Sequence, residues 1–109
     1  MRHLIPPVYS FEWDEAKALR NFQKHGISFD LARTVFHDPA ILTVPDLEHS
    51  EAEERWFSVG RASSGVVLSV AHLWSDRMRS EAQDGVIVIR IISARRATRS
   101  EIGYYEGAL

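Results

Sequence analysis

Four arginines gather where a strongly apolar segment of this sequence ends. The run at residues 86–92 is typical of a strand buried on both faces, and Arg95, Arg96 and Arg99 follow it. A guanidinium is always charged, and its planar fork fits phosphate oxygens. Taken singly, these three arginines are better explained as a solvated surface. Arg90 differs because it lies within the apolar run, where a cation needs a partner, either a carboxylate of this chain such as Glu54 or a phosphate of a ligand.

Two charged dipeptides offer groups for proton transfer. Lys24 and His25 stand at the expected end of a helix, where they could bind a phosphate and shuttle a proton, although capping of the helix dipole explains them better. Glu54 and Arg55 stand at the start of an expected strand. Neighbouring strand residues point to opposite faces, so each needs its own partner, and the ordinary alternative is a strand-edge pair.

The aromatic residues divide between stacking and packing. Tryptophan rings can stack on bases, but core or core-edge positions are favoured for all three of them, Trp13, Trp56 and Trp74. In the last helix, the spacing puts Tyr105 on the packing face with Ile102 and leaves Tyr104 more exposed.

The sequence carries none of the common metal or cofactor motifs. Its five histidines show no ligand spacing, and neither a phosphate-binding glycine loop nor a serine nucleophile motif occurs. We therefore expect no metal and no cofactor, and any enzyme of this sequence would work without either.

The first helix is expected to begin after Asp14, a good N-cap, and to end before Gly26. Its apolar stripe is formed by Ala16, Leu19 and Phe22. The other side of this helix is expected to carry Lys17, Asn21 and Lys24.

The remaining elements predict an α+β fold. Ser28 caps a second helix, which Asp38 and Pro39 stop. Strands are expected at residues 11–13, 40–44, 55–62, 66–74 and 86–94, a loop at residues 75–85, and a helix at residues 99–107 that Thr98 and Glu101 cap. Consecutive strands with short links indicate a small antiparallel sheet with two N-terminal helices and one C-terminal helix. We divide the chain into a tail at residues 1–10 and a single domain at residues 11–109.

The composition is ordinary for a globular protein. Of 109 residues, 45% are hydrophobic and 26% are charged, and the formal net charge of −2 excludes binding of polyanions by bulk charge alone. Cysteine is absent, no apolar run has membrane-spanning length, and no signal peptide is recognisable, so we expect a cytoplasmic protein.

The segment at residues 90–98 resembles the C-terminal part of the BrnT toxins, the ribonuclease half of a bacterial type II toxin–antitoxin pair. Further matching positions are residues 11–17, 24–29, 32, 35–36, 38–39, 46, 49–50, 53–55 and 60. The resemblance runs from residue 11 to about residue 106 and implies a RelE-like fold that cuts RNA without a metal. It also implies a BrnA-like antitoxin that binds DNA, so that the pair represses its own operon. Two departures are the longer segment at residues 75–85 and the extra N-terminal tail.

The resemblance implies an RNA site built from the charged residues above. We expect six catalytic candidates, namely Lys24, His25, Glu54, Arg90, Arg95 and Tyr105. Four more residues are expected to bind RNA, namely Arg55, Ser93, Arg96 and Arg99. In this scheme Arg90, Arg95 and Lys24 stabilise charge, His25 or Glu54 is the base, and Tyr104 or Tyr105 is a weaker acid candidate.

Two other hypotheses stand beside the ribonuclease. The same fold could be a non-catalytic module that holds an antitoxin and acts as co-repressor, or an unrelated nucleic-acid-binding protein could use the arginines alone. Growth arrest on expression without a partner would favour the ribonuclease.

Overall fold

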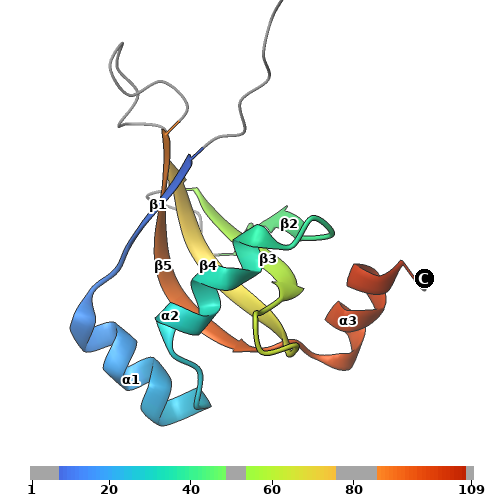
Figure 1. The fold of residues 1–109 in the computed structure, drawn as a ribbon, viewed down its shortest axis with the longest axis horizontal. Coiled ribbons are helices and arrows are strands. Elements are labelled where there is room, and N and C mark those ends of the chain that lie inside the picture. Colours follow the sequence, from blue (N-terminus) through green and yellow to red (C-terminus); the bar gives the residue numbers. More distant parts are fainter. Residues whose placement is uncertain (1–7, 49–53, 76–85, 108–109) are drawn as a thin grey trace, which may run out of the picture.

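The computed structural model describes residues 8–48, 54–75 and 86–107. Five strands and three helices follow one another with one 3-10 helix among them (Figure 1). In chain order they are β1 (Val8–Glu12), α1 (Glu15–His25), α2 (Phe29–Ala32), η1 (Arg33–His37), β2 (Leu42–Pro45), β3 (Arg55–Arg61), β4 (Val67–Ser75), β5 (Val86–Arg96) and α3 (Arg99–Glu106). The expected loop at residues 75–85 falls almost wholly outside the described residues.

All five strands form one sheet in the order β1-β5-β4-β3-β2. The antiparallel pairing of β3, β4 and β5 confirms the predicted sheet, and β2 adds to it as an antiparallel edge strand. The other edge strand, β1, pairs with β5 in parallel. That pairing begins at Val8, so residues 8–10 of the predicted tail belong to the sheet. The α+β fold class is confirmed.

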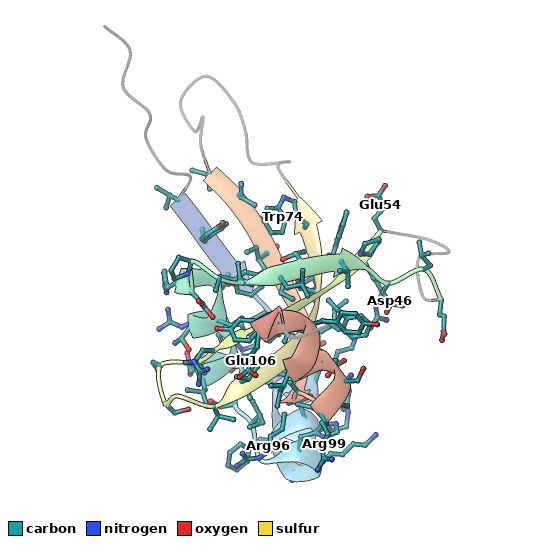
Figure 2. All side chains as sticks on the ribbon, turned by 90° about the vertical axis from the view of Figure 1, so that its right-hand side faces the viewer. Asp46, Glu54, Trp74, Arg96, Arg99 and Glu106 are labelled. Atoms are coloured by element: carbon teal, nitrogen blue, oxygen red, sulfur yellow. The ribbon has the colours of Figure 1, made fainter. Side chains whose placement is uncertain are left out.

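The hydrophobic core lies between one face of the sheet and the segment that holds α1, α2 and η1. Its buried members include Ile27 and Phe29 from the helical side and Leu68, Ile89 and Ile91 from the strands. The last helix, α3, lies on the other side of the sheet, in front of the strands in Figure 2. We call the two sides the covered face and the arginine face, the latter after the residues described below.

The helix ends follow the sequence signals. The Asp14 side chain accepts hydrogen bonds from the amides of Ala16 and Lys17, and Gly26 ends α1 with a φ of 72°. At α3 the predicted capping box is present, with Thr98 and Glu101 each bonded to the backbone of the other.

The predicted orientation of α1 is wrong. Asn21 is buried, whereas Leu19 and Phe22 are 59% and 53% exposed. The Asn21 amide donates to the carbonyls of Ile27 and Ala94, and its oxygen accepts from the Ala94 amide. Buried backbone groups must be hydrogen-bonded, including those of Ala94 near the end of β5. This requirement determines which side of α1 faces the sheet, in place of the apolar stripe.

A chain of polar groups crosses the covered face. His72 is fully buried, and its Nε2 lies 2.8 Å from Ser58 Oγ, which lies 2.8 Å from Thr43 Oγ1. The His72 Nδ1 faces the Leu73 carbonyl at 3.4 Å. A carbonyl only accepts, so the network assigns the proton to Nδ1 and makes Nε2 the acceptor of the Ser58 hydroxyl. Burial lowers the pKa of His72 to about 4, and the ring is therefore neutral at neutral pH.

None of the helices in the described part of the chain has the length and apolar character that crossing a bilayer requires.

Candidate functional site

Arginines from two strands lie in one row across the sheet. The strand register pairs Arg55 with Leu73, Leu73 with Arg90, and Arg90 with Glu12. Residues paired in this way point to the same face, so Arg55 and Arg90 share a face with Leu73 between them. Two strand spacings separate their backbones, which is about 10 Å.

A β-bulge in β5 brings Arg95 to this same face. In the register with β4, Ile91 pairs with His72 and Ser93 pairs with Ala71, so that Ile92 is the extra residue. Residues five apart on a regular strand point to opposite faces, but one extra residue reverses the alternation. The bulge thus allows Ile91 and Ala94 to remain in the core while Ser93 and Arg95 face outward with Arg90.

Arg55, Arg90 and Arg95 each contact a carboxylate of the chain. Arg90 Nη1 lies 3.1 Å from Glu12 Oε2. Arg95 makes a two-pronged pair with Glu101, at 2.8 and 2.9 Å. Arg55 Nε lies 3.9 Å from an oxygen of Asp46, which is buried. The hydrogen bond from Arg95 also lowers the pKa of Glu101.

The sequence anticipated a carboxylate beside Arg90 but suggested Glu54 for it. The partner is Glu12, which lies on β1 and approaches Arg90 through the parallel pairing that the sequence signals did not reveal. The Arg90 side chain is also 38% exposed, so it is less desolvated than its apolar neighbours implied. Ion pairs at this exposure contribute about 0–1 kcal/mol to stability, so the carboxylates mainly orient the guanidinium groups.

Tyr105 is tied to the body of the protein by a carboxylate. Its hydroxyl donates to Asp38, which also accepts from the Arg61 backbone amide. The bond to Asp38 raises the pKa of Tyr105, so the phenol keeps its proton. The Arg61 guanidinium lies 6.0 Å from the centre of the Tyr105 ring. In this arrangement Tyr105 holds α3 against the rest of the fold.

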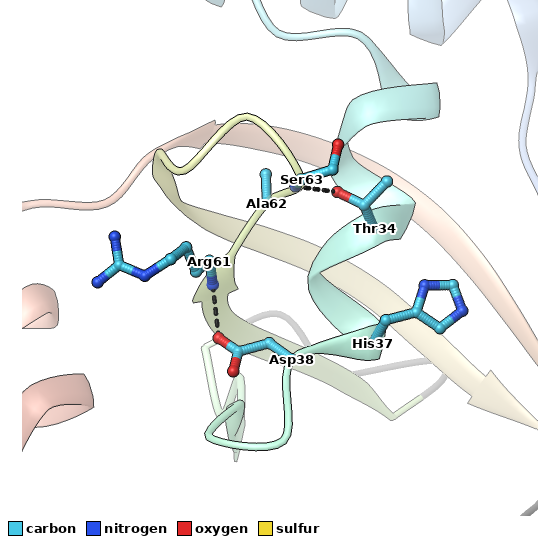
Figure 3. A pocket seen from close by; sticks show the side chains of 6 residues that line it. All are labelled: Thr34, His37, Asp38, Arg61, Ala62 and Ser63. Carbon is cyan, nitrogen blue, oxygen red and sulfur yellow. Dashed lines mark hydrogen bonds between the residues drawn. The ribbon is translucent and has the colours of Figure 1, made fainter.

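A shallow pocket of about 350 Å³ lies beside this tyrosine contact. Thr34, His37, Asp38, Arg61, Ala62 and Ser63 line it. In Figure 3 the Arg61 and His37 side chains point away from each other, and Asp38 is bonded to the Arg61 backbone. The polar groups of this pocket therefore do not converge on one point. The sequence signals had given Asp38 only the role of stopping a helix.

The remaining candidates lie apart from the row of arginines. Lys24 and His25 end α1, which Asn21 fixes to Ala94 on the covered face. Glu54 is exposed just before β3. Figure 2 places Arg96 and Arg99 together at the far end of the molecule from Glu54.

The structure thus gathers four of the ten predicted site residues on the arginine face, which are Arg55, Arg90, Ser93 and Arg95. The carboxylates Glu12, Asp46 and Glu101 belong to the same site and were not among the predicted residues. The capping-box spacing of Glu101 was visible in the sequence, whereas the positions of Glu12 and Asp46 depend on strand pairing. Within the described residues, no group of three or more histidine, aspartate or glutamate side chains could hold a metal ion.

Comparison with known proteins identifies the family of the chain. Residues 13–101 match the family model of the ribonuclease toxin BrnT of type II toxin–antitoxin systems. The fold is similar to the 1.1 Å crystal structure of the Brucella abortus ribonuclease toxin BrnT, with a TM-score of 0.53 and 20% sequence identity. That match covers 80% of this chain and 94% of the other. No curated protein matches the sequence. Because the family model spans most of its length, the chain belongs to the BrnT family of ribonuclease toxins of type II toxin–antitoxin systems.

Proposed function

We propose that this protein is a metal-independent endoribonuclease toxin that inhibits translation by cutting RNA, and that its arginine face holds the substrate. The observation that carries the proposal is the bulge in β5, which puts Arg90, Ser93 and Arg95 on one face with Arg55. Arginines whose backbones lie about 10 Å apart across the strands can engage separate phosphates of one RNA strand. The family of the chain supports the same conclusion.

The reaction needs no cofactor because RNA carries its own nucleophile. The 2′-hydroxyl attacks the adjacent phosphorus, the bond to the 5′-oxygen breaks, and the products are a cyclic phosphate and a free 5′-hydroxyl. One proton leaves the 2′-oxygen and one proton joins the 5′-oxygen. The protein must align the strand, accept the first proton, and neutralise charge on the phosphate.

We assign charge neutralisation to Arg90, supported by Arg95. A phosphate bound by Arg90 would lie beside Glu12, whose carboxylate contacts the same guanidinium. We therefore assign the base to Glu12 in place of His25 or Glu54, which lie elsewhere. Tyr105, the acid candidate, donates a hydrogen bond to Asp38 and would serve the reaction only after releasing that carboxylate.

The other predicted contacts then extend the RNA path. Arg55 and Ser93 flank Arg90 on the arginine face, and Arg96 and Arg99 lie at the end of the molecule where β5 meets α3. Lys24 and His25, on α1, are proposed to meet RNA that passes round this end of the sheet. These assignments rest on charge and position.

The partner that silences the enzyme is proposed to be a BrnA-like antitoxin that binds DNA, so that operator DNA is contacted only through the antitoxin. Acidic side chains of the antitoxin would compete with RNA for the arginine face, because covering the phosphate site blocks the substrate directly. Crosslinks that map only to the acidic segment at residues 46–54, and not to Arg90 or Arg95, would contradict this.

The test of the activity is cleavage of single-stranded RNA by the purified toxin in the presence of EDTA. Cleavage that persists is expected, and Glu12→Gln should lower kcat more than it raises KM, because a base acts only in the transition state. Cleavage that requires an added metal ion would contradict the proposal. Full activity of Glu12→Gln would contradict the assignment of Glu12 as the base.

A non-catalytic module that only holds the antitoxin is the second candidate. It is favoured by the carboxylates beside Arg55, Arg90 and Arg95, since this arrangement also suits a surface that binds a protein partner. Expression without the antitoxin separates the two candidates. Growth arrest that Arg90→Ala relieves supports the enzyme, and tolerated expression of the wild-type chain supports the module.

A further inference from the structure

Helix α1 turns its large apolar side chains to solvent. Leu19 and Phe22 are both more than half exposed, and their spacing of three makes them neighbours on the helix surface. The side that packs on the sheet carries Asn21 and the half-buried Ala18. An arrangement that buries an amide and exposes a leucine and a phenylalanine leaves an apolar surface without a partner among the described residues.

This surface continues into a groove of about 290 Å³ between α1 and the start of α2. Its apolar lining includes Trp13, Leu19, Phe22 and Phe29. Phe29 is buried, and the Trp13 ring meets it edge-on at 5.8 Å between centroids. The Trp13 indole donates a hydrogen bond to Glu15, which fixes the position of the Trp13 ring at the side of the groove. The aromatic rings of Trp13 and Phe29 therefore give the groove a fixed shape.

The charged lining of the groove consists of two carboxylates, Glu15 and Asp30. Carboxylates repel RNA phosphates, so the groove is unsuited to the substrate. An apolar groove with an acidic rim is complementary to a helix that presents aliphatic side chains next to Lys or Arg. Asp30 can serve such a partner because it is largely exposed and contacts only Arg33 among the pairs described, at 3.5 Å.

We infer that this groove, with Leu19 and Phe22, is the anchoring site for an amphipathic helix of the antitoxin, with aliphatic residues on one face and basic residues beside them. The inference rests on the proposed function insofar as the partner is the antitoxin of a toxin pair. It deepens that function because α1 and the arginine face lie on opposite sides of the sheet. Anchoring at Leu19 and Phe22 is therefore separate from covering the arginine face, and the antitoxin uses one segment for each.

The test measures the affinity of the purified cognate antitoxin for toxin variants by isothermal titration calorimetry. Leu19→Asp and Phe22→Asp should each raise Kd by about 100-fold, as expected for a central apolar contact. Asp30→Lys should raise Kd by about 10-fold through charge alone. Leu47→Asp is the matched control, since Leu47 is 84% exposed and lies away from α1, and its Kd should stay within about threefold of the wild type.

Folding and catalysis serve as independent readouts. The substituted side chains are exposed, so thermal melting and RNA cleavage should be unchanged, and Phe22→Ser gives a milder variant if the aspartate affects folding. An unchanged Kd for Leu19→Asp and Phe22→Asp overturns the inference. A toxin dimer that these changes dissociate in the absence of antitoxin would assign the groove to a second copy instead. Loss of RNA cleavage with unchanged Kd would assign it to the substrate.

The outcome is distinguishable from failure of the proposed enzyme. A wild-type chain that binds the antitoxin through α1 but does not cut RNA refutes the ribonuclease and leaves the docking site standing. A chain that cuts RNA but binds the antitoxin equally well with either aspartate variant refutes the docking site alone.

Discussion

The two faces of the sheet differ in the burial and charge of their polar side chains. On the covered face, His72 is fully buried, neutral and hydrogen-bonded to Ser58. On the arginine face, Arg90 and Arg95 keep their charges in contact with both solvent and carboxylates. The same strands therefore supply buried core contacts on one side and, under the proposed function, the RNA-binding surface on the other. Substitutions on the covered face should unfold the protein, whereas those on the arginine face should inactivate a protein that remains folded.

Replacement of Arg90 is the strongest test of this contrast. Arg90→Ala should lower kcat for RNA cleavage by about 100- to 1,000-fold, because it removes the main positive charge at the reacting phosphate. The melting temperature should change little, since the partly exposed pair with Glu12 contributes little stability. Arg96→Ala is the control on the same strand and should weaken cleavage less.

Two results would contradict this prediction. A variant that melts far below the wild type would make Arg90 a structural residue, and a folded variant with full activity would remove it from the site.

The covered face should respond to pH through His72. In the folded state its pKa is about 4, against 6.5 for an exposed ring, so below pH 6.5 the unfolded chain binds more protons. The contribution of neutral His72 to stability should therefore be fully present above pH 6.5. The free energy of unfolding should fall by about 3 kcal/mol as the pH decreases to 4. Urea unfolding across this range measures the change.

The matched variant is His72→Gln, which cannot titrate. Carboxylates such as Asp38 and Glu101, whose pKa values are lowered, also lose stability in acid, but they are present in both proteins. The difference between the two pH profiles isolates the histidine. Parallel profiles would mean that His72 is not held neutral by burial.

Replacement of Asn21 should destabilise the protein as replacement of a core residue does, although its side chain is polar. Asn21→Ala removes three hydrogen bonds and leaves the Ala94 amide and carbonyl unpaired, so it should destabilise the fold by about 2–3 kcal/mol. Urea unfolding at pH 7 measures this loss. Gln23→Ala, at an exposed position of the same helix, is the control, and equal stability of the two variants would refute the role of Asn21.

The smallest effect is expected at the junction between the arginine face and α3. Glu101→Gln weakens the two-pronged contact with Arg95 but keeps a side chain able to cap Thr98, so stability should fall by less than about 1 kcal/mol. Because Arg95 loses its orientation, KM for RNA should rise while kcat changes little. A fall in kcat as large as that of Arg90→Ala would show that the carboxylate acts on the reaction itself.

Local signals in the sequence predicted most of the fold. Asp14, Gly26 and Thr98 cap helices as expected, because each cap depends only on residues within four positions of it. The three long strands were predicted within two residues at each boundary. The parallel pairing of β1 was missed, since no local pattern specifies a partner 78 residues away.

The site was harder to predict than the fold. The arginines were recognised, but their common face depends on the bulge at Ile92, and simple alternation would have placed Arg95 opposite Arg90. The prediction of how α1 is oriented was wrong for a similar reason. Apolar spacing pointed to Leu19 and Phe22, while the need to pair buried backbone groups of a distant strand selected Asn21.

The pairing of β1 with β5 also determines when the site can form. Glu12 and Arg90 are separated by 78 residues, and their contact requires the first and last strands of the sheet to meet. During synthesis, β1 emerges from the ribosome long before β5 and has no partner strand until β5 follows. Closing so long a loop is slow compared with forming the β3–β4 hairpin. A nascent chain therefore carries no assembled arginine face until its last strand has been released and has paired with β1.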